Sequence, residues 1–512
     1  MKQYPFKNLM SLSALSTALM LTGCGGGGSS SGGDPAPAET TNSTQYTFAS
    51  KFDDTKSSVS YGGQTVRQLI IKDITDSIGA LEEDITADVT ADLDVLIRGD
   101  AVNGNVDSEV RPYATDELFT PIEATYGDVY DTTYGSISGN KNLKGKIAGG
   151  DGAGSGEITK LIGDEFFGWE DGADVTPIPI ELVDFYVAQL DSLVTDGVDP
   201  TIETVAGPVG LTPVVYVDIQ GRDYKQLMQK FLLGAVTFSQ GTNDYLTTDF
   251  ASINIQDGSD PFSEAEHKWD EAFGYFGAAR NYNDYTDLEI RAKSGRAEYS
   301  SGYHDLDGDT KIDLRAEINV ANSVNCAKRD IGSTTGLDYT KTAFDAFLSG
   351  RQALNDAANG MLTADQLATV EAQAKIAAVT WEVCIAATVV HYINEVRNDD
   401  LAAFVDGKFA DITAFKDLAK HWSEMKGFAL GLQFSPYSPF RDGSVADVDV
   451  NDLKEILTLM GDAPVLADGS QNGVAAAGTA ADAVADYSND LLAARNKLQQ
   501  AYGFDAGDVA AW

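Results

Sequence analysis

The stretch IAAVTWEVCIAATVVHYI, residues 376–393, is apolar on nearly every side of a helix, and it decides the fold class. It lies inside a longer helical pattern over 364–397. A membrane-spanning helix has this length, but Glu382 and His391 would be costly in lipid. We therefore expect a helix buried at the centre of a bundle, with these two polar residues on opposite faces.

Apolar residues at helical spacing recur on both sides of this segment. Two helix starts fit a capping box, Ser263 with Glu266 and Thr363 with Gln366. Strand patterns are few, and 214–218 is the best short candidate. The sequence thus predicts a mostly α fold of antiparallel helical bundles with long loops and few strands. The expected helices cover 64–85, 87–97, 179–196, 221–239, 263–279, 317–331, 339–358, 364–397, 412–432, 450–460 and 479–502.

Composition limits the partners of the chain. A hydrophobic share of 43% in 512 residues allows a sizeable core. Asp and Glu number 78 against 36 Lys and Arg, which gives a net charge of −42. Nucleic acid and anionic lipid headgroups would be repelled, so we expect divalent cations as small partners and no nucleic-acid binding. Only four His and three Cys are present, which excludes a zinc-finger array.

The N-terminus has the order of a secretory signal peptide over residues 1–23. Two lysines precede an apolar run, which ends in Leu21-Thr-Gly-Cys24. This ending resembles a bacterial lipobox, which implies cleavage before Cys24 and lipid on its thiol. The alternative is an ordinary signal peptide that happens to contain a cysteine. Gly25, in place of Asp, is similar to outer-membrane sorting in Gram-negative lipoproteins.

Residues 24–45 are rich in Gly, Ser and Pro and are expected to form a flexible tether. We expect the body, 46–512, to be held at the outer membrane by the lipid alone, facing the periplasm or the cell surface.

A run of alternating carboxylates, DLDGDTKID at 305–313, matches the first nine positions of an EF-hand loop. Two positions depart from that pattern. Position 6 is Thr310 rather than Gly, and position 12 is Ala316, with Glu317 one place later. A solvated acidic turn is the alternative. The expected Ca²⁺ ligands are Asp305, Asp307, Asp309, Lys311 through its carbonyl, Asp313 and Glu317.

Three of the four histidines have carboxylates one helical turn away, a spacing that helical bundles use to bind metals. Surface pairing in a chain with 78 acids is the alternative at each histidine. No His-Glu-x-x-His and no Gly-x-Ser-x-Gly is present, so a zincin protease and a serine hydrolase are unsupported. We expect a second metal site, for iron or another divalent metal, formed by His267, Asp270, Glu271, His421 and Glu424.

Two of these helices share the pattern Trp-x-Glu-x-x-Gly-aromatic, at 269–275 and 422–428. The offset, 422 − 269 = 153 residues, is about one domain length. We expect the two helices to hold equivalent places in two pseudo-symmetric halves, 46–300 and 301–512. The alternative is that both are core helices anchored by Trp, in which Gly allows close packing.

With Cys24 lipidated, Cys326 and Cys384 remain in an oxidising envelope, and an even pair there is expected to form a disulfide. Two separate buried thiols are the alternative.

The segments 222–246, 267–277 and 420–429, together with the lipobox, resemble the bacterial lipoprotein family called domain of unknown function 4856. The resemblance covers most of 46–512, and the family has no established activity. The chain is also distantly similar to the imelysins, which implies paired helical bundles, a link to iron uptake and a proposed metallopeptidase activity. Imelysins carry Gly-x-His-x-x-Glu, whereas this chain has Ala265 and Asp270 in place of the Gly and the Glu. This departure argues against peptidase activity and leaves metal binding open.

The sequence therefore favours a non-enzymatic envelope lipoprotein that binds cations, with iron capture as one form of that role. A metallopeptidase similar to imelysins and a structural scaffold of the envelope are the alternatives.

Overall fold

The computed structural model describes residues 44–82, 84, 86–99, 126, 128–131, 134–138, 141–149, 161–170, 178–196 and 199–512. Within these ranges the chain forms fifteen α-helices and one two-stranded sheet, which confirms the mostly α fold. The predicted signal peptide, the lipidation site Cys24 and nearly all of the tether lie outside the described residues.

The long helices lie close to the ranges that the sequence predicts. Four helices of four to six residues are additional: α5 (Tyr134–Ser138), α8 (Phe250–Ile253), α10 (Asp287–Ile290) and α17 (Ala506–Ala511). The others are α2 (Gly62–Gly79), α3 (Val89–Arg98), α6 (Pro179–Thr195), α7 (Tyr224–Leu232), α9 (Glu264–Phe276), α11 (Ala321–Ile331), α12 (Tyr339–Asn355), α13 (Ala364–Glu395), α14 (Ile412–Gly431), α15 (Val450–Met460) and α16 (Ala480–Tyr502).

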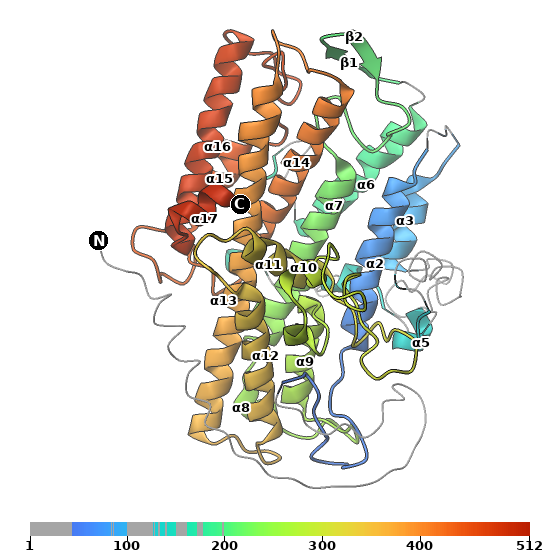
Figure 1. Cartoon of the computed structure of the whole chain (residues 1–512), viewed down its shortest axis with the longest axis vertical. Coiled ribbons are helices and arrows are strands. Elements are labelled where there is room, and N and C mark those ends of the chain that lie inside the picture. The colour runs from blue at the N-terminus through green and yellow to red at the C-terminus, as the bar shows by residue number, and fades with distance from the viewer. Residues whose placement is uncertain are drawn as a thin grey trace.

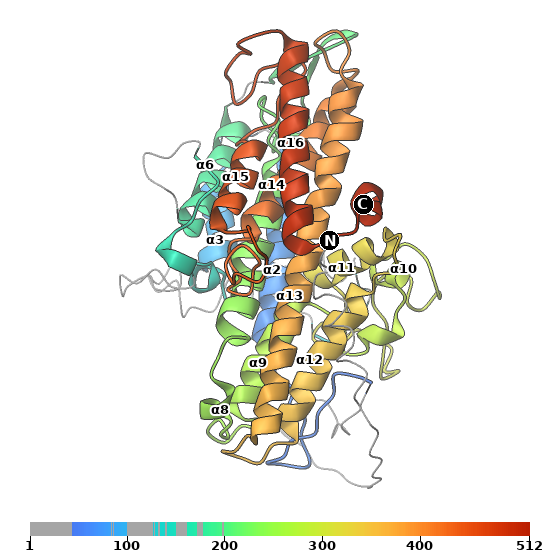
Figure 2. The same cartoon turned by 90° about the vertical axis from the view of Figure 1, so that its left-hand side faces the viewer.

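The central element is α13, which follows most of the long axis of the molecule (Figures 1 and 2). It packs against α12 along its N-terminal part and against α14 and α16 along its C-terminal part. The side chains of Trp381, Val383 and Val390 have no exposed surface. The helix is long and apolar enough to cross a membrane, but most of its apolar stretch is buried in the bundle, as the sequence predicts.

Both predicted capping boxes are formed. At the start of α13, the Thr363 hydroxyl accepts the amide of Gln366, and the Gln366 side chain accepts the amide of Thr363. Ser263 and Glu266 make the same reciprocal pair at the start of α9. Because each pair satisfies two otherwise free amides, it fixes where the helix begins.

Helix α7 continues through two π-helical segments, η4 (Leu233–Phe238) and η5 (Gln240–Tyr245), and lies against α14. The backbones nearly touch at Gly234 and Gly431, since a Cβ on Gly234 would lie 2.7 Å from the Cα of Gly431. A side chain at Gly234 would not fit in this contact. The two segments can approach so closely here because Gly234 and Gly431 have no side chains.

The predicted strand at 214–218 is wrong. The sheet is instead a short antiparallel hairpin of β1 (Thr201–Thr204) and β2 (Gly207–Gly210), in which Thr201 pairs with Gly210. Residues 214–218 form one isolated bridge, from Val217 to Asp223. The apolar side chains of 214–218 pack on the core, so their alternation reflects tertiary contacts and not a sheet.

Helices from both sides of residue 300 pack together, since α12 lies against α9 and α14 lies against α7. The division of the body into halves at that residue stays a prediction.

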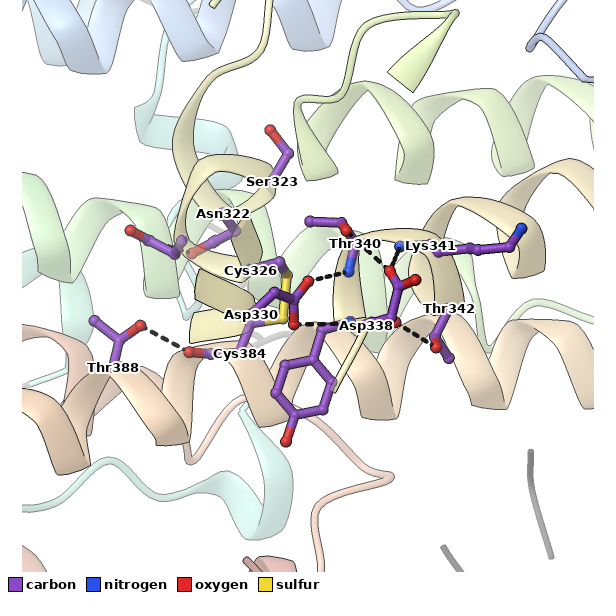
Figure 3. The surroundings of a disulfide bond; sticks show 12 residues. Asn322, Ser323, Cys326, Asp330, Asp338, Thr340, Lys341, Thr342, Cys384 and Thr388 are labelled. Carbon is purple, nitrogen blue, oxygen red and sulfur yellow. Dashed lines mark hydrogen bonds between the residues drawn. A yellow bond between two sulfur atoms is a disulfide. The ribbon is translucent and has the colours of Figure 1, made fainter. Parts of the chain in front are cut away.

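A disulfide joins Cys326 of α11 to Cys384 of α13, with their Cα atoms 4.9 Å apart (Figure 3). Next to it, the carboxylate of Asp330 accepts the backbone amides of Tyr339 and Thr340, each at 2.9 Å. The middle of α11 is thereby attached covalently to α13, and its C-terminal end is attached through hydrogen bonds to the start of α12. These contacts fix the three helices at the middle of the bundle.

Candidate functional site

The loop from Asp305 to Glu317 lies between α10 and α11 and is folded by its own carboxylates. Asp305 accepts the amides of Gly308 at 2.7 Å and Thr310 at 2.8 Å, and Asp307 accepts the amide of Asp309 at 3.1 Å. Thr310 has φ +76°, so it adopts the left-handed conformation that an EF-hand loop requires at its sixth position. The backbone thus makes the expected turn even though Thr replaces Gly.

Three carboxylates of this loop converge. Ligand atoms of Asp305, Asp307 and Glu317 all lie within 4.8 Å of one another. Glu317 is buried and accepts the amides of Leu306 at 2.7 Å and Asp313 at 2.8 Å, so its carboxylate has a fixed orientation. Burial raises the pKa of Glu317 to about 7. Three hard oxygen donors in this arrangement suit Ca²⁺.

The other predicted ligands of the loop are placed differently. The Asp313 carboxylate accepts the amide of Arg315 at 2.9 Å and its Nε at 3.1 Å. Asp309 is exposed and accepts the amide of Lys311 at 2.8 Å. Neither carboxylate belongs to the converging group, and the carbonyl of Lys311 as a ligand stays a prediction.

A second segment of the chain, residues 128–130, supports this loop. Ile312 is buried and forms a parallel bridge with Val129, in which its amide donates to Asp128 and its carbonyl accepts from Tyr130, both at 2.9 Å. Just before the loop, the ring of His304 stacks on Tyr299 with 3.9 Å between ring centroids. The loop is therefore held by hydrogen bonds to residues 128 and 130, and the segment that leads into it by ring stacking.

The second predicted metal site is not assembled as the sequence suggests. Asp270 is completely buried and its carboxylate is already occupied. Its Oδ1 accepts the Tyr46 hydroxyl and Arg351 Nε, each at 2.8 Å, and its Oδ2 accepts the amide of Ser60 at 3.0 Å. The ion pair with Arg351 therefore engages this carboxylate, and a metal ligand at Asp270 stays a prediction.

His421 belongs to a different cluster, at the junction of α13 and α14. Its Nδ1 lies 3.0 Å from Asp400 Oδ2, and its Nε2 lies 3.5 Å from Glu395 Oε2. The other oxygen of Glu395 lies 3.5 Å from Nε2 of His391, so one carboxylate bridges two imidazoles. Burial opposes charge on His421, but the hydrogen bond and charge of Asp400 outweigh burial and raise its pKa.

The pKa values of the two imidazoles shift in opposite directions. Burial, followed by the nearby Arg329 guanidinium, lowers the pKa of His391 to about 3, so this ring is neutral. Glu424 lies 3.2 Å from Lys230 Nζ and is engaged in that ion pair. Sequence reasoning missed Asp400, because it lies at the end of a π-helical turn, η7 (Val396–Asp400), where regular helical spacing does not hold.

His267 and Glu271 lie in a third place, on the wall of a cavity of about 640 Å³. The ring of His267 stacks on Phe262 with 4.7 Å between centroids, and its Nδ1 is buried with no hydrogen-bond partner among the described residues. Glu271 accepts Gln64 Nε2 at 2.7 Å. The structure therefore separates His267 from His421 and does not form one site from the five predicted residues.

The repeated motif has matching contacts in its two copies. The indole of Trp269 donates to the carbonyl of Phe347 at 2.9 Å, and that of Trp422 donates to the carbonyl of Met460 at 3.2 Å. Each motif glycine also meets a neighbouring segment closely, Gly274 at Tyr61 just before α2 and Gly427 at Lys230 of α7. These contacts are what Trp anchors and close-packing glycines provide in a core.

Comparison with known proteins identifies the family. No curated protein and no solved structure matches the chain. A family model described as "Domain of unknown function (DUF4856)" matches residues 165–439, which is more than half of the chain. The matched region extends from the segment before α6 to the end of α14, and so includes the Asp305–Glu317 loop, the disulfide and both copies of the repeated motif. The chain belongs to this family of unknown function.

Proposed function

We propose that this chain is a non-enzymatic lipoprotein of the bacterial envelope that binds one Ca²⁺ ion in the Asp305–Glu317 loop. The observation that carries the proposal is the convergence of Asp305, Asp307 and Glu317 within 4.8 Å. All three donors are carboxylate oxygens, so the ligand set suits Ca²⁺ better than the softer transition metals.

The location is proposed from the N-terminal sequence and from the disulfide. A Cys326–Cys384 bridge is typical of an oxidising compartment. The lipobox-like ending at Cys24 supplies the anchor to the outer membrane of a Gram-negative bacterium. Replacing Cys24 by Ala is expected to abolish incorporation of labelled palmitate and to release the chain from the membrane fraction. Labelling of the variant at the wild-type level would contradict the proposal.

Calorimetry on the purified chain tests the calcium site. We expect one Ca²⁺ per chain with Kd of about 10⁻⁴–10⁻³ M, the range of extracellular modules. Asp305→Asn should weaken binding by about tenfold or more, because it removes a charged ligand. Glu371→Gln, which neutralises an exposed acid on α13, is the matched control and should leave Kd unchanged. A wild-type chain that gives no heat at millimolar Ca²⁺ would rule the site out.

Metal capture at the histidines and peptidase activity have less support. Asp270, which occupies the place of the imelysin glutamate, is bound to Arg351. Iron binding would have to use the His391, Glu395 and His421 cluster, where His421 already pairs with Asp400.

A further inference from the structure

Arg329, in the last turn of α11, is a buried cation without a partner. The residue is 5% exposed, and its guanidinium makes no hydrogen bond and no ion pair within the described part of the chain. The buried arginines Arg222, Arg315 and Arg351 instead each form an ion pair with an aspartate. Burial lowers the pKa of Arg329 to about 10. Because a buried charge is normally paired, this guanidinium lacks a counter-ion that the fold does not supply.

Two further cations without partners lie beside Arg329. Lys328 precedes it on α11, and Arg291 directly follows α10, which packs against α11 (Figure 2). Neither side chain makes a hydrogen bond or an ion pair with any described residue, and Nε of Arg291 is buried. Burial lowers the pKa of Lys328 to about 8, and the positive charges of Lys230, Arg329 and Arg291 contribute to this shift. Three uncompensated cations therefore lie close together in a chain whose net charge is −42.

The carboxylate that acts on Lys328 is already engaged. Glu424 favours the charged form of Lys328, but each of its oxygens has another cation nearby. Its Oε1 lies 3.2 Å from Lys230 Nζ, and its Oε2 lies 3.9 Å from Lys420 Nζ. Glu424 is therefore shared by two lysines that are not part of the unpaired group.

The carboxylates that act on Arg329 are Glu395 and Asp330, and both have other partners. Glu395 lies 3.5 Å from Nε2 of His391 and 3.5 Å from Nε2 of His421. Asp330 accepts two backbone amides at the start of α12. Neither acid comes within ion-pair distance of Arg329, so the charge of the guanidinium is left for a ligand.

We propose that Arg291, Lys328 and Arg329 form a site for a compact, multivalent oxyanion of the phosphate class, taken as the free ion or as the phosphate group of a small ligand. Guanidinium groups offer planar pairs of donors, and an ammonium adds a point charge, a combination that suits phosphate oxygens. Arg291 and Lys328 are partly exposed, so the anion can approach the buried Arg329 from the surface. The anion would supply the counter-ion that these three side chains lack.

Calorimetry with inorganic phosphate tests the site on the full chain, in calcium-free buffer so that calcium phosphate does not form. We expect saturable binding. Lys328→Gln should weaken it by about tenfold, because one charge-assisted hydrogen bond is lost. Lys328 is partly exposed, so this variant should keep the wild-type fold. The matched control is Lys408→Gln, which removes an exposed cation that pairs with Glu203 and should leave Kd unchanged.

Arg329→Met separates a binding role from a structural one. Methionine is apolar and of similar length, so the variant loses an unpaired buried charge and keeps most of the packing. In phosphate-free buffer its Tm should be at least as high as that of wild type. Phosphate should raise the Tm of wild type, because the ligand binds only the folded chain, and should leave the Tm of the variant unchanged.

Four outcomes would overturn the proposal: no saturable heat with wild-type chain, equal weakening by Lys408→Gln and Lys328→Gln, a lower Tm of Arg329→Met than of wild type without phosphate, or an equal rise of both Tm values with phosphate. Binding of citrate without phosphate would assign the cations to carboxylates and also overturn it. Tighter binding of glycerol 3-phosphate than of phosphate would support a phosphate ester as the ligand, and the reverse order would support the free ion.

Discussion

Arg351 Nε lies 2.8 Å from Asp270 Oδ1, and neither side chain has any exposed surface. The same guanidinium donates from Nη1 to Glu266 at 2.9 Å and from Nη2 to the carbonyl of Ser58 at 3.0 Å. One arginine of α12 therefore joins two acids of α9 to the segment that precedes α2. Its charge is fully matched inside the core.

Removing this arginine should be severely destabilising. Arg351→Met leaves the buried Asp270 without a cation and Glu266 with only Lys51, whose Nζ lies 3.6 Å from Glu266 Oε1. Breaking a buried pair costs about 3–5 kcal/mol. We expect that loss in the free energy of unfolding, measured by urea denaturation followed by circular dichroism. Lys341→Met, on the exposed face of the same helix, should change it by less than about 0.5 kcal/mol. Similar losses in both variants would show that the ion pair is not the cause.

Glu382 should make stability depend on pH. Burial in the core raises its pKa to about 7, and the hydroxyl of Tyr502 donates to it at 2.7 Å. In the unfolded chain the carboxyl of Glu382 has its ordinary pKa of 4.5. Protonation of Glu382 therefore contributes its full share of the folding stability below pH 4.5. It is lost as the pH rises to about 7. Asp442 and the guanidinium of Arg441 are the nearby charges.

Glu382→Gln removes this dependence because the amide does not ionise. At pH 8 the variant should be more stable than wild type by on the order of 2 kcal/mol, and near pH 4.5 the two should be similar. Urea denaturation at both pH values gives the comparison. Glu371→Gln on the exposed face of α13 is the control, and an equal gain at pH 8 in that variant would contradict the assignment.

The disulfide should contribute substantially to stability. Cys326 and Cys384 are 58 residues apart, and closing a loop of that length stabilises the fold by about 4 kcal/mol at most. The double variant Cys326→Ala with Cys384→Ala should therefore unfold at lower urea concentration. Thiol titration of unfolded, unreduced mature protein should find none, and two free thiols per chain would refute the bridge.

The backbone contact at Gly234 predicts a steric effect. Gly234→Ala directs a methyl group at the Cα of Gly431, a backbone atom that cannot turn aside, and should cost about 1–3 kcal/mol. Gly145→Ala is the control, because a Cβ there meets nothing within 4 Å. The difference in Tm between the two variants is the measurement. A Gly234→Ala chain as stable as the control would mean that α7 and α14 separate at little cost.

Local sequence patterns predict where the helices lie, but they do not predict which residues meet in the folded protein. Helical spacing and the capping boxes are properties of neighbouring residues, so α9 and α13 begin where the sequence predicts. The partner of Asp270 is Arg351, 81 residues away, and no local pattern signals it. The loop falls between these cases, since its alternating acids are local, whereas the burial of Glu317 depends on the surrounding fold.

The bridge between Cys326 and Cys384 also determines what proteolysis can do to the molecule. The turn between α12 and α13 lies inside the covalent ring, and Met361 in that turn is 65% exposed. A protease that cuts there would open one peptide bond, yet the two fragments would stay joined through sulfur. A nicked chain would therefore migrate as a single species until it is reduced, and the C-terminal helices would not be shed from the rest of the body.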